Sequence, residues 1–169
     1  DAPIAIPSVL TKFKLTKHMD LRLSYAYGFR SPTLQELYFS FHNDNHDIDG
    51  NPDLKAEYSH NITGSVAYRV LHSEKIHLTT TLSGIYNDFR DKNSLAQNVD
   101  IPNYNTYYNI DRYTTVGGSL ENSFSWGGLR AHLNVSLIGR YNRYATGDHS
   151  MPRYRSSHAV STSISHHIE

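Results

Sequence analysis

The sequence predicts an all-β fold, in which about seven antiparallel strands form a segment of a transmembrane β-barrel. Three observations carry this prediction. Segment after segment alternates apolar and polar residues, which is the period of a strand with one buried face. These segments are about 10–16 residues long, whereas ordinary strands usually have about 5 or 6. Their connections alternate between short and long, as in outer-membrane barrels, whose strands need about 9–11 residues to cross.

The first half of the chain predicts three strands and one helical turn. A strand at 9–17 is followed by a short polar turn and a second strand at 21–30, whose odd positions are apolar and whose even positions are polar or small. Pro32 ends this strand, because proline has no amide hydrogen to donate. Thr33 and Glu36 have the spacing of a capping box and predict one helical turn. Residues 40–53 are predicted as a polar loop, and the third strand starts at about residue 55.

The second half predicts four more strands with the same plan. Residues 76–87 alternate, 88–105 form a long loop rich in Asn and Asp, and a strand then runs to residue 126. Gly127 and Gly128 predict a two-residue hairpin. The next strand covers 129–142, a third loop covers 145–155, and the last strand covers 158–168. A soluble β-sandwich is the alternative, but it predicts shorter strands and less regular loops.

Aromatic residues gather at both ends of the apolar band, as in the two girdles of a membrane barrel. The group near the long loops is Tyr27, Phe29, Tyr86, Phe89 and Tyr141, and the group near the short turns is Tyr68, Phe124 and Trp126.

Composition excludes several classes of function. The formal net charge of zero removes the electrostatic case for nucleic-acid binding. The absence of cysteine excludes disulfide and thiolate chemistry. We find no nucleophile–base set, no paired carboxylates at recognisable spacing and no glycine-rich phosphate loop, so we expect no enzyme. The chain does not start with Met, and we interpret all of residues 1–169 as one piece of a longer barrel.

Two short motifs flank the loop predicted at 40–53. The first box consists of Phe29, Arg30, Ser31 and Pro32, followed by Glu36, Leu37, Tyr38 and Phe39; the second box consists of Asn51, Pro52, Asp53 and Leu54, followed by Glu57. The pair resembles the FRAP and NPNL boxes of TonB-dependent outer-membrane receptors. Ser31 stands where the family pattern has Ala, and Asp53 where it has its second Asn.

The resemblance implies a location and a set of partners. Members of the family lie in the bacterial outer membrane, in contact with its lipid, and import iron chelates, haem or cobalamin. They have about 22 strands around a plug domain, the class of barrel with a filled lumen. The chain would then be about a third of the wall, with the plug and the final strands outside it, and the TonB complex would act through the missing N-terminal part. We therefore expect an energy-coupled receptor that imports a metal chelate, with haem or another iron complex as the first choice. Alternatives are a cobalamin receptor of the same family, or a non-transporting surface adhesin or binding domain.

The same resemblance points to candidate ligand-binding residues. Receptors of this family that take haem carry a histidine between the two boxes, where this chain has His42 and His46. An imidazole nitrogen can ligate haem iron, and either histidine could take this role. Phe39 and Phe41 beside His42 could pack on a porphyrin, which slightly favours His42, and Tyr38 is a further candidate contact. The alternative is that both histidines are solvated loop residues.

Two further candidates have structural alternatives. Arg30 would contact an anionic ligand or the plug, or else belong to a polar wall facing the lumen with Arg22, Arg69, Arg130 and Arg140. Residues 45–50, with Asp47 and Asp49 at alternate positions and Gly50 at the sixth, resemble the start of a calcium loop. The EF-hand pattern then requires Glu at the twelfth position, where this chain has Ala56. A solvated turn is the alternative there.

Overall fold

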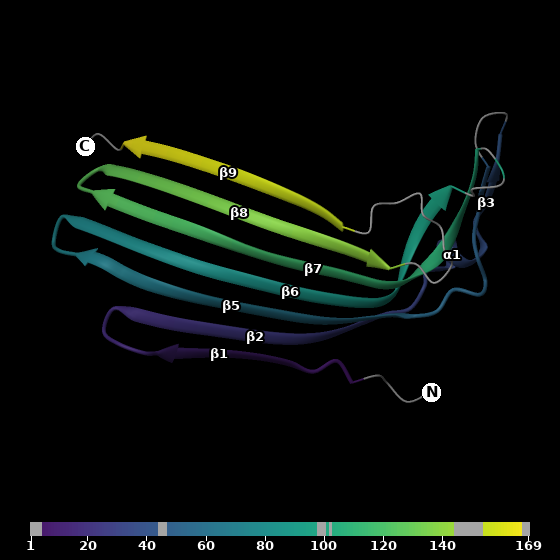
Figure 1. The fold of residues 1–169 in the computed structure, drawn as a ribbon, viewed down its shortest axis with the longest axis horizontal. Helices are drawn as coiled ribbons and strands as arrows, with labels where there is room; N and C mark the ends of the chain where they lie inside the picture. The colour runs from purple at the N-terminus through teal and green to yellow at the C-terminus, as the bar shows by residue number, and fades with distance from the viewer. Residues whose placement is uncertain (1–4, 44–46, 98–100, 102, 144–153, 167–169) are drawn as a thin grey trace.

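Seven long strands lie side by side in one curved sheet in the computed structural model (Figure 1), which describes residues 5–43, 47–97, 101, 103–143 and 154–166. They pair in the order β1-β2-β5-β6-β7-β8-β9, each antiparallel to its neighbour. The strands are β1 (Ser8–Lys14), β2 (Met19–Arg30), β5 (Glu57–His72), β6 (Ile76–Gln97), β7 (Tyr104–Trp126), β8 (Leu129–Arg143) and β9 (Tyr154–His166). Three short elements, α1 (Leu34–Tyr38), β3 (Ser40–His42) and β4 (Asp47–Asp49), lie between β2 and β5 in sequence.

The predicted antiparallel fold is confirmed, and the seven predicted strands are the seven long ones. The loop predicted at 88–105 is wrong, because β6 continues to Gln97 and β7 begins at Tyr104. Strands β6 and β7 therefore have 22 and 23 residues. Apolar alternation fades in this outer part, but the ladder continues through backbone hydrogen bonds, which do not depend on hydropathy. The loop predicted at 40–53 is also partly wrong, since it holds β3 and β4. Most of the loop predicted at 145–155 lies outside the described residues.

The strand register gives the sheet one apolar face and one polar face. Directly paired residues share a face, and neighbours along a strand alternate between faces. One row across the seven long strands is apolar throughout: Phe13, Leu21, Val66, Leu82, Leu120, Val135 and Val160. The adjacent row is polar or small throughout: Lys12, Arg22, Ser65, Ser83, Ser119, Ser136 and Ala159.

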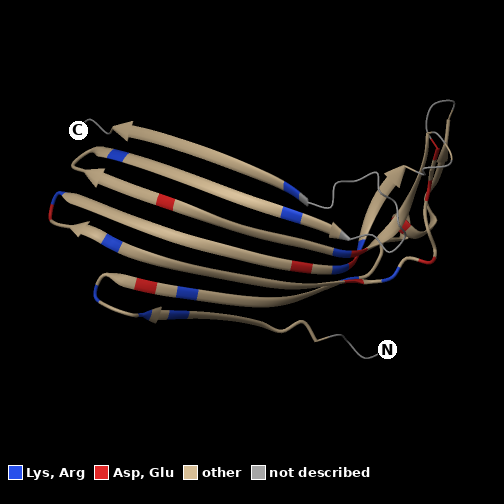
Figure 2. Ribbon diagram, viewed as in Figure 1, with Lys and Arg blue, Asp and Glu red and all other residues tan. Residues whose placement is uncertain are grey.

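The apolar face is covered by no second layer of described chain. Leu82 is 60% exposed and Val160 is 65% exposed, and among the described hydrophobic residues only Leu54 and Ile110 are buried. A soluble β-sandwich would bury such a face between two sheets. Charged residues gather towards the strand ends and around α1, leaving long uncharged stretches between them (Figure 2). An exposed apolar band of this kind is expected of a sheet that faces lipid.

The structure places one residue of the predicted girdles, Phe89, on the polar face. Phe29, from the same girdle, lies on the apolar face as expected and packs against Tyr58 there, with ring centroids 5.4 Å apart. Phe89 was expected beside Tyr86 in the same girdle, and this is wrong. The two residues are three positions apart in an extended strand, so they face opposite sides. Phe89 instead packs on Tyr113 at 5.8 Å on the polar face.

No described helix is long and apolar enough to span a membrane.

The two faces predict opposite outcomes for one substitution at neighbouring positions. Val135→Arg places a charge in the middle of the apolar row, where it is expected to cost about 2–4 kcal/mol of unfolding free energy in a bilayer. Ser136→Arg is the matched control on the polar face and is expected to change stability little. Urea unfolding of the full-length receptor in lipid vesicles measures both. Equal costs at the two positions would contradict the assignment of the apolar face to lipid.

Candidate functional site

The segment between the two boxes folds back onto the wall at the long-loop end of the sheet (Figure 1). β3 and β4 form an antiparallel hairpin, and β4 pairs in parallel with the start of β7. Asp47 lies opposite Tyr104, and Asp49 lies opposite Thr106. The hairpin and the outer ends of β6 and β7 thus form one sheet beyond the apolar band, and candidate ligand-binding residues lie on it.

Helix α1 begins at a complete capping box, as the sequence predicts. The hydroxyl of Thr33 accepts a hydrogen bond from the Glu36 amide at 3.2 Å, and Oε2 of Glu36 accepts one from the Thr33 amide at 2.8 Å. A helix of five residues is too short to be stable alone. Its position therefore depends on contacts with the rest of the chain.

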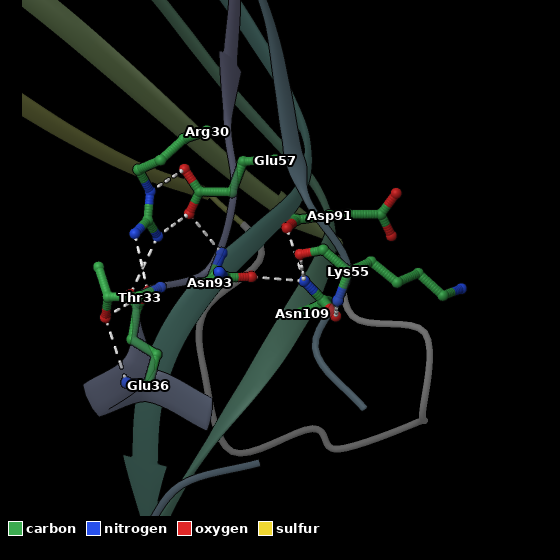
Figure 3. A network of polar contacts seen from close by, with 8 residues as sticks. All are labelled: Arg30, Thr33, Glu36, Lys55, Glu57, Asp91, Asn93 and Asn109. Carbon is green, nitrogen blue, oxygen red and sulfur yellow. Dashed lines mark hydrogen bonds and ion pairs between the residues drawn. The ribbon is translucent and has the colours of Figure 1, made fainter. Parts of the chain in front are cut away.

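Arg30, at the end of β2, supplies the main contact (Figure 3). Its guanidinium donates two hydrogen bonds to Glu36, at 2.8 and 3.0 Å, and two to Glu57, at 2.7 and 3.0 Å. The planar fork of arginine suits such paired carboxylates. The two carboxylates are 15% and 14% exposed, so they need this partner. Arg30 is thus engaged by the protein, in agreement with the structural alternative for this residue.

Glu57 extends the network into the neighbouring strands (Figure 3). It accepts a further hydrogen bond from the amide of Asn93 on β6 at 2.6 Å. On β7, the side chain of Asn109 accepts from the amide of Lys55 at 2.9 Å and donates to the carbonyl of Asp91 at 2.7 Å. The start of β5 is therefore tied to the outer ends of both β6 and β7.

The second box bridges α1 and β7. The amide of Asn51 donates to the carbonyl of Glu36 at 2.8 Å, while its side chain donates to the carbonyl of Tyr107 at 2.9 Å. The side-chain oxygen of Asn51 also accepts from the amide of Asp53 at 2.9 Å, which closes a turn around Pro52. Leu54 is only 9% exposed. The two boxes are thus joined to each other and to the outer ends of β6 and β7 at the rim of the wall. We call this hydrogen-bonded cluster of Arg30, Glu36, Asn51, Glu57, Asn93 and Asn109 the bracket.

Gly50 allows this bracket to close. Its amide donates to the Phe39 carbonyl at 2.6 Å, and a Cβ added to it would lie 2.6 Å from the carbonyl carbon of Leu37 and from the amide nitrogen of Tyr38. Close approach to the α1 backbone therefore accounts for this glycine.

His42 lies on β3 with both ring nitrogens near acceptors. Nδ1 is 3.1 Å from a carboxylate oxygen of Asp47, and Nε2 is 2.9 Å from the Ser40 hydroxyl and 3.4 Å from Asp49. The side chain is 57% exposed, so it is accessible to a ligand. His46, the other histidine candidate, lies outside the described residues.

Phe41 lies on the other face of the hairpin, whereas Tyr38 is the last residue of α1. Phe41 is paired with Ile48, between the pairs that carry His42 and Ser40, and so points away from both. Its ring stacks on Phe39, with centroids 6.4 Å apart and planes at 9°. Tyr38 is 68% exposed and Phe41 is 45% exposed.

Asp47 and Asp49 share one face of an extended strand instead of wrapping around a central point. Their carboxylates contact His42 and Ser40, and the hydrogen bond from Ser40 holds the pKa of Asp49 below its usual range. Within the described ranges, no group of three or more His, Cys, Asp or Glu residues is arranged to hold a metal ion. Calcium binding at Asp47 and Asp49 stays a prediction.

The sequence did not reveal the asparagines of the bracket. Asn51 was singled out only through the second box, Asn93 was taken as a member of the polar loop at 88–105, and Asn109 was not singled out. Asn109 lies within β7. Only the register between β6 and β7 brings Asn93 opposite Asn109.

An exposed apolar band on long antiparallel strands and a structured rim define the class of this protein as the wall of a membrane-embedded β-barrel. A family model described as "TonB dependent receptor-like, beta-barrel" matches residues 4–163. The chain therefore belongs to the TonB-dependent receptor family and to the bacterial outer membrane.

Three relatives from Haemophilus influenzae are similar to parts of the chain. Hemoglobin-binding protein A is 32% identical over 116 residues, which is 63% of this chain and 11% of the relative. Hemoglobin and hemoglobin-haptoglobin-binding proteins C and B are each 37% identical over 76 residues, which is 45% of this chain and 7% of each relative. The matched part of the chain thus spans about a tenth or less of the length of these relatives.

Substitution of Gly50 is expected to open the bracket. Gly50→Ala forces the new Cβ against α1 backbone, at a cost of about 1–3 kcal/mol. Faster hydrogen exchange at the amides of Gly50 and Asn51, measured in the full-length receptor, reports the opening. Gly84→Ala is the control, because its Cβ would lie 3.9 Å from the nearest atom. Unchanged exchange in Gly50→Ala would contradict the close contact.

The Arg30–Glu36 pair predicts a dependence on acid. Hydrogen bonds from Arg30 lower the pKa of Glu36 from 4.5 to about 2. A carboxylate whose folded pKa is depressed stabilises the fold above its unfolded pKa and loses this contribution as pH falls. Docking of α1 is therefore expected to weaken between about pH 4.5 and pH 2. The amide shift of Thr33 in NMR spectra follows this step, which Glu36→Gln is expected to remove. A wild-type midpoint at pH 4.5 would contradict the pairing.

Proposed function

We propose that this chain is part of the wall of an energy-coupled outer-membrane receptor that imports haem. The observation that carries the proposal is His42, an exposed imidazole held by carboxylates on a structured hairpin at the rim. The names of the Haemophilus relatives, which describe binding of hemoglobin, favour the same cargo. The family consists of transport receptors, which favours an importer over a non-transporting adhesin and over an enzyme.

The contacts of His42 suit a ligand to haem iron. A ligating histidine usually donates its second ring N–H to a carboxylate or carbonyl, which orients the ring and makes the ligating nitrogen more basic. Asp47, 3.1 Å from Nδ1, is in place for this role. Nε2 then faces the iron, after its contacts with Ser40 and Asp49 are exchanged for the metal.

The aromatic residues have a separate task in this proposal. Because Phe41 points to the opposite face of the hairpin, it does not stack on a porphyrin bound at His42. We assign Phe41 and the exposed Tyr38 to the surface that a haem-carrying protein contacts as it approaches the rim. Arg30 is not assigned to the cargo, since Glu36 and Glu57 occupy its guanidinium.

The remaining partners belong to the rest of the receptor. The polar face of the sheet faces the lumen, where the plug domain sits, and the TonB complex supplies energy through segments beyond this chain. Outer-membrane lipid covers the apolar face. A siderophore or cobalamin as cargo would use the rim only as aromatic and polar contact surface, with no bond from histidine to iron.

Visible absorption distinguishes these cargoes. In a titration of the full-length receptor with haem, the wild-type protein is expected to give a saturable Soret shift that His42→Ala abolishes. Asp47→Asn is expected to weaken binding by about 10–100-fold, as loss of an orienting partner usually does. His18→Ala is the matched control, because His18 lies in the turn between β1 and β2 at the far end of the sheet.

The other outcomes are equally clear. If His46→Ala alone abolishes the shift, the second histidine is the ligand and His42 is a hairpin residue. If the wild-type receptor gives no saturable shift, haem is not the cargo and a siderophore or cobalamin takes its place. Family membership does not depend on either result.

A further inference from the structure

A pair of histidines faces each other at the opposite end of the sheet from His42. His72 ends β5 and His77 lies near the start of β6, and the two are direct partners across the short hairpin turn. A one-residue irregularity in β5, between Arg69 and Leu71, sets this alignment. In the register that Arg69 and Thr79 share, His72 would instead lie opposite Ile76. The irregularity thus brings two imidazoles together that a regular ladder would separate.

The two rings have the spacing of ligands on one metal ion. Their Nδ1 atoms are 2.9 Å apart, and their centroids are 4.7 Å apart with planes at 48°. Two imidazole nitrogens at roughly 2.0–2.1 Å from a tetrahedral or octahedral ion lie roughly 2.9–3.4 Å from each other. Rings joined in a straight line by an N–H···N bond of this length would have centroids roughly 5 Å apart. The rings are therefore not joined in a straight line, and their Nδ1 atoms have the separation of two ligands on one ion.

From this geometry we propose that His72 and His77 bind one divalent transition-metal ion through their Nδ1 atoms. Imidazole suits Cu²⁺, Ni²⁺ and Zn²⁺, with Cu²⁺ the tightest in the usual order of affinity. Without metal, one ring must donate the shared proton to the other. The ion takes the position of that proton, which moves through solvent to Nε2 of the same ring, so that both neutral rings then carry their hydrogen on Nε2.

The surroundings leave room for the remaining ligands. His72 and the turn residues Ser73, Glu74 and Lys75 are exposed, so water can complete the coordination. No third His, Cys, Asp or Glu joins the pair in the described part of the chain. The ion would cross-link β5 and β6 next to their short turn, on the periplasmic side of the wall. This site is independent of the cargo, because it lies at the other end of the strands from His42.

Binding of Cu²⁺ to the full-length receptor tests the site. Electron paramagnetic resonance of the wild-type protein at one equivalent of Cu²⁺ is expected to show coupling to two imidazole nitrogens. His72→Gln and His77→Gln are each expected to remove this signal and to weaken that site by about tenfold or more, because the second ligand of a chelate acts at high effective concentration. His132→Gln, on β8, is the control and is expected to bind as the wild type does.

A second measurement separates loss of the site from loss of the fold. Zn²⁺ is expected to slow hydrogen exchange at the amide of Ser73, which bonds to the Ile76 carbonyl at 2.9 Å beside the pair, in the wild type alone. Equal Cu²⁺ stoichiometry and affinity in the wild type and both variants would overturn the proposal. So would Cu²⁺ uptake by the wild type only at concentrations that load free imidazole.

Discussion

The rim of this barrel wall depends on one guanidinium. Arg30 binds Glu36 of α1 and Glu57 of β5 at once, and both carboxylates are largely buried. Removal of the arginine would leave two carboxylates that are largely shielded from solvent without their positive charge, and the loss of one member of such an ion pair is strongly destabilising. The helix is too short to hold its own position, and the second box docks on it through the amide of Asn51. The hairpin that carries His42 is in turn reached through α1, so its placement depends on the same ion pairs.

The wall itself obeys a different constraint. Its sheet has an apolar face that no other described layer covers, so it lacks the interior core of a soluble protein. Lipid covers the apolar face in place of such a core. Each strand therefore alternates, because one set of its side chains faces lipid and the other faces the lumen. Beyond the apolar band the strands no longer face lipid, yet β6 and β7 continue, because paired backbones satisfy each other's hydrogen bonds in water as well as in lipid. These extensions provide the edge on which β4 docks.

The structure also separates roles that adjacent residues seemed to share. His42 and Phe41 are neighbours in sequence but face opposite sides of a two-stranded ribbon. The imidazole belongs to the face that carries Asp47 and Asp49, and the aromatic ring belongs to the face that carries Ile48. The hairpin at the rim therefore presents two different surfaces, a polar one with His42, Asp47 and Asp49 and an apolar one with Phe41 and Ile48.

Local patterns in the sequence determined the seven long strands, the capping box at Thr33 and the two-faced wall, because each depends on alternation or on residues a few positions apart. Tertiary structure alone decided the rest. The parallel pairing of β4 with β7, the bonds of Asn93 and Asn109, and the convergence of Arg30, Glu36 and Glu57 all join residues distant in sequence, whose meeting depends on register. Register also set His72 opposite His77, through a single irregularity in β5 that no hydropathy pattern marks. A two-residue shift of register changes every cross-strand partner but keeps each side chain on its own face, and for that physical reason the sequence determined the wall but not its sites.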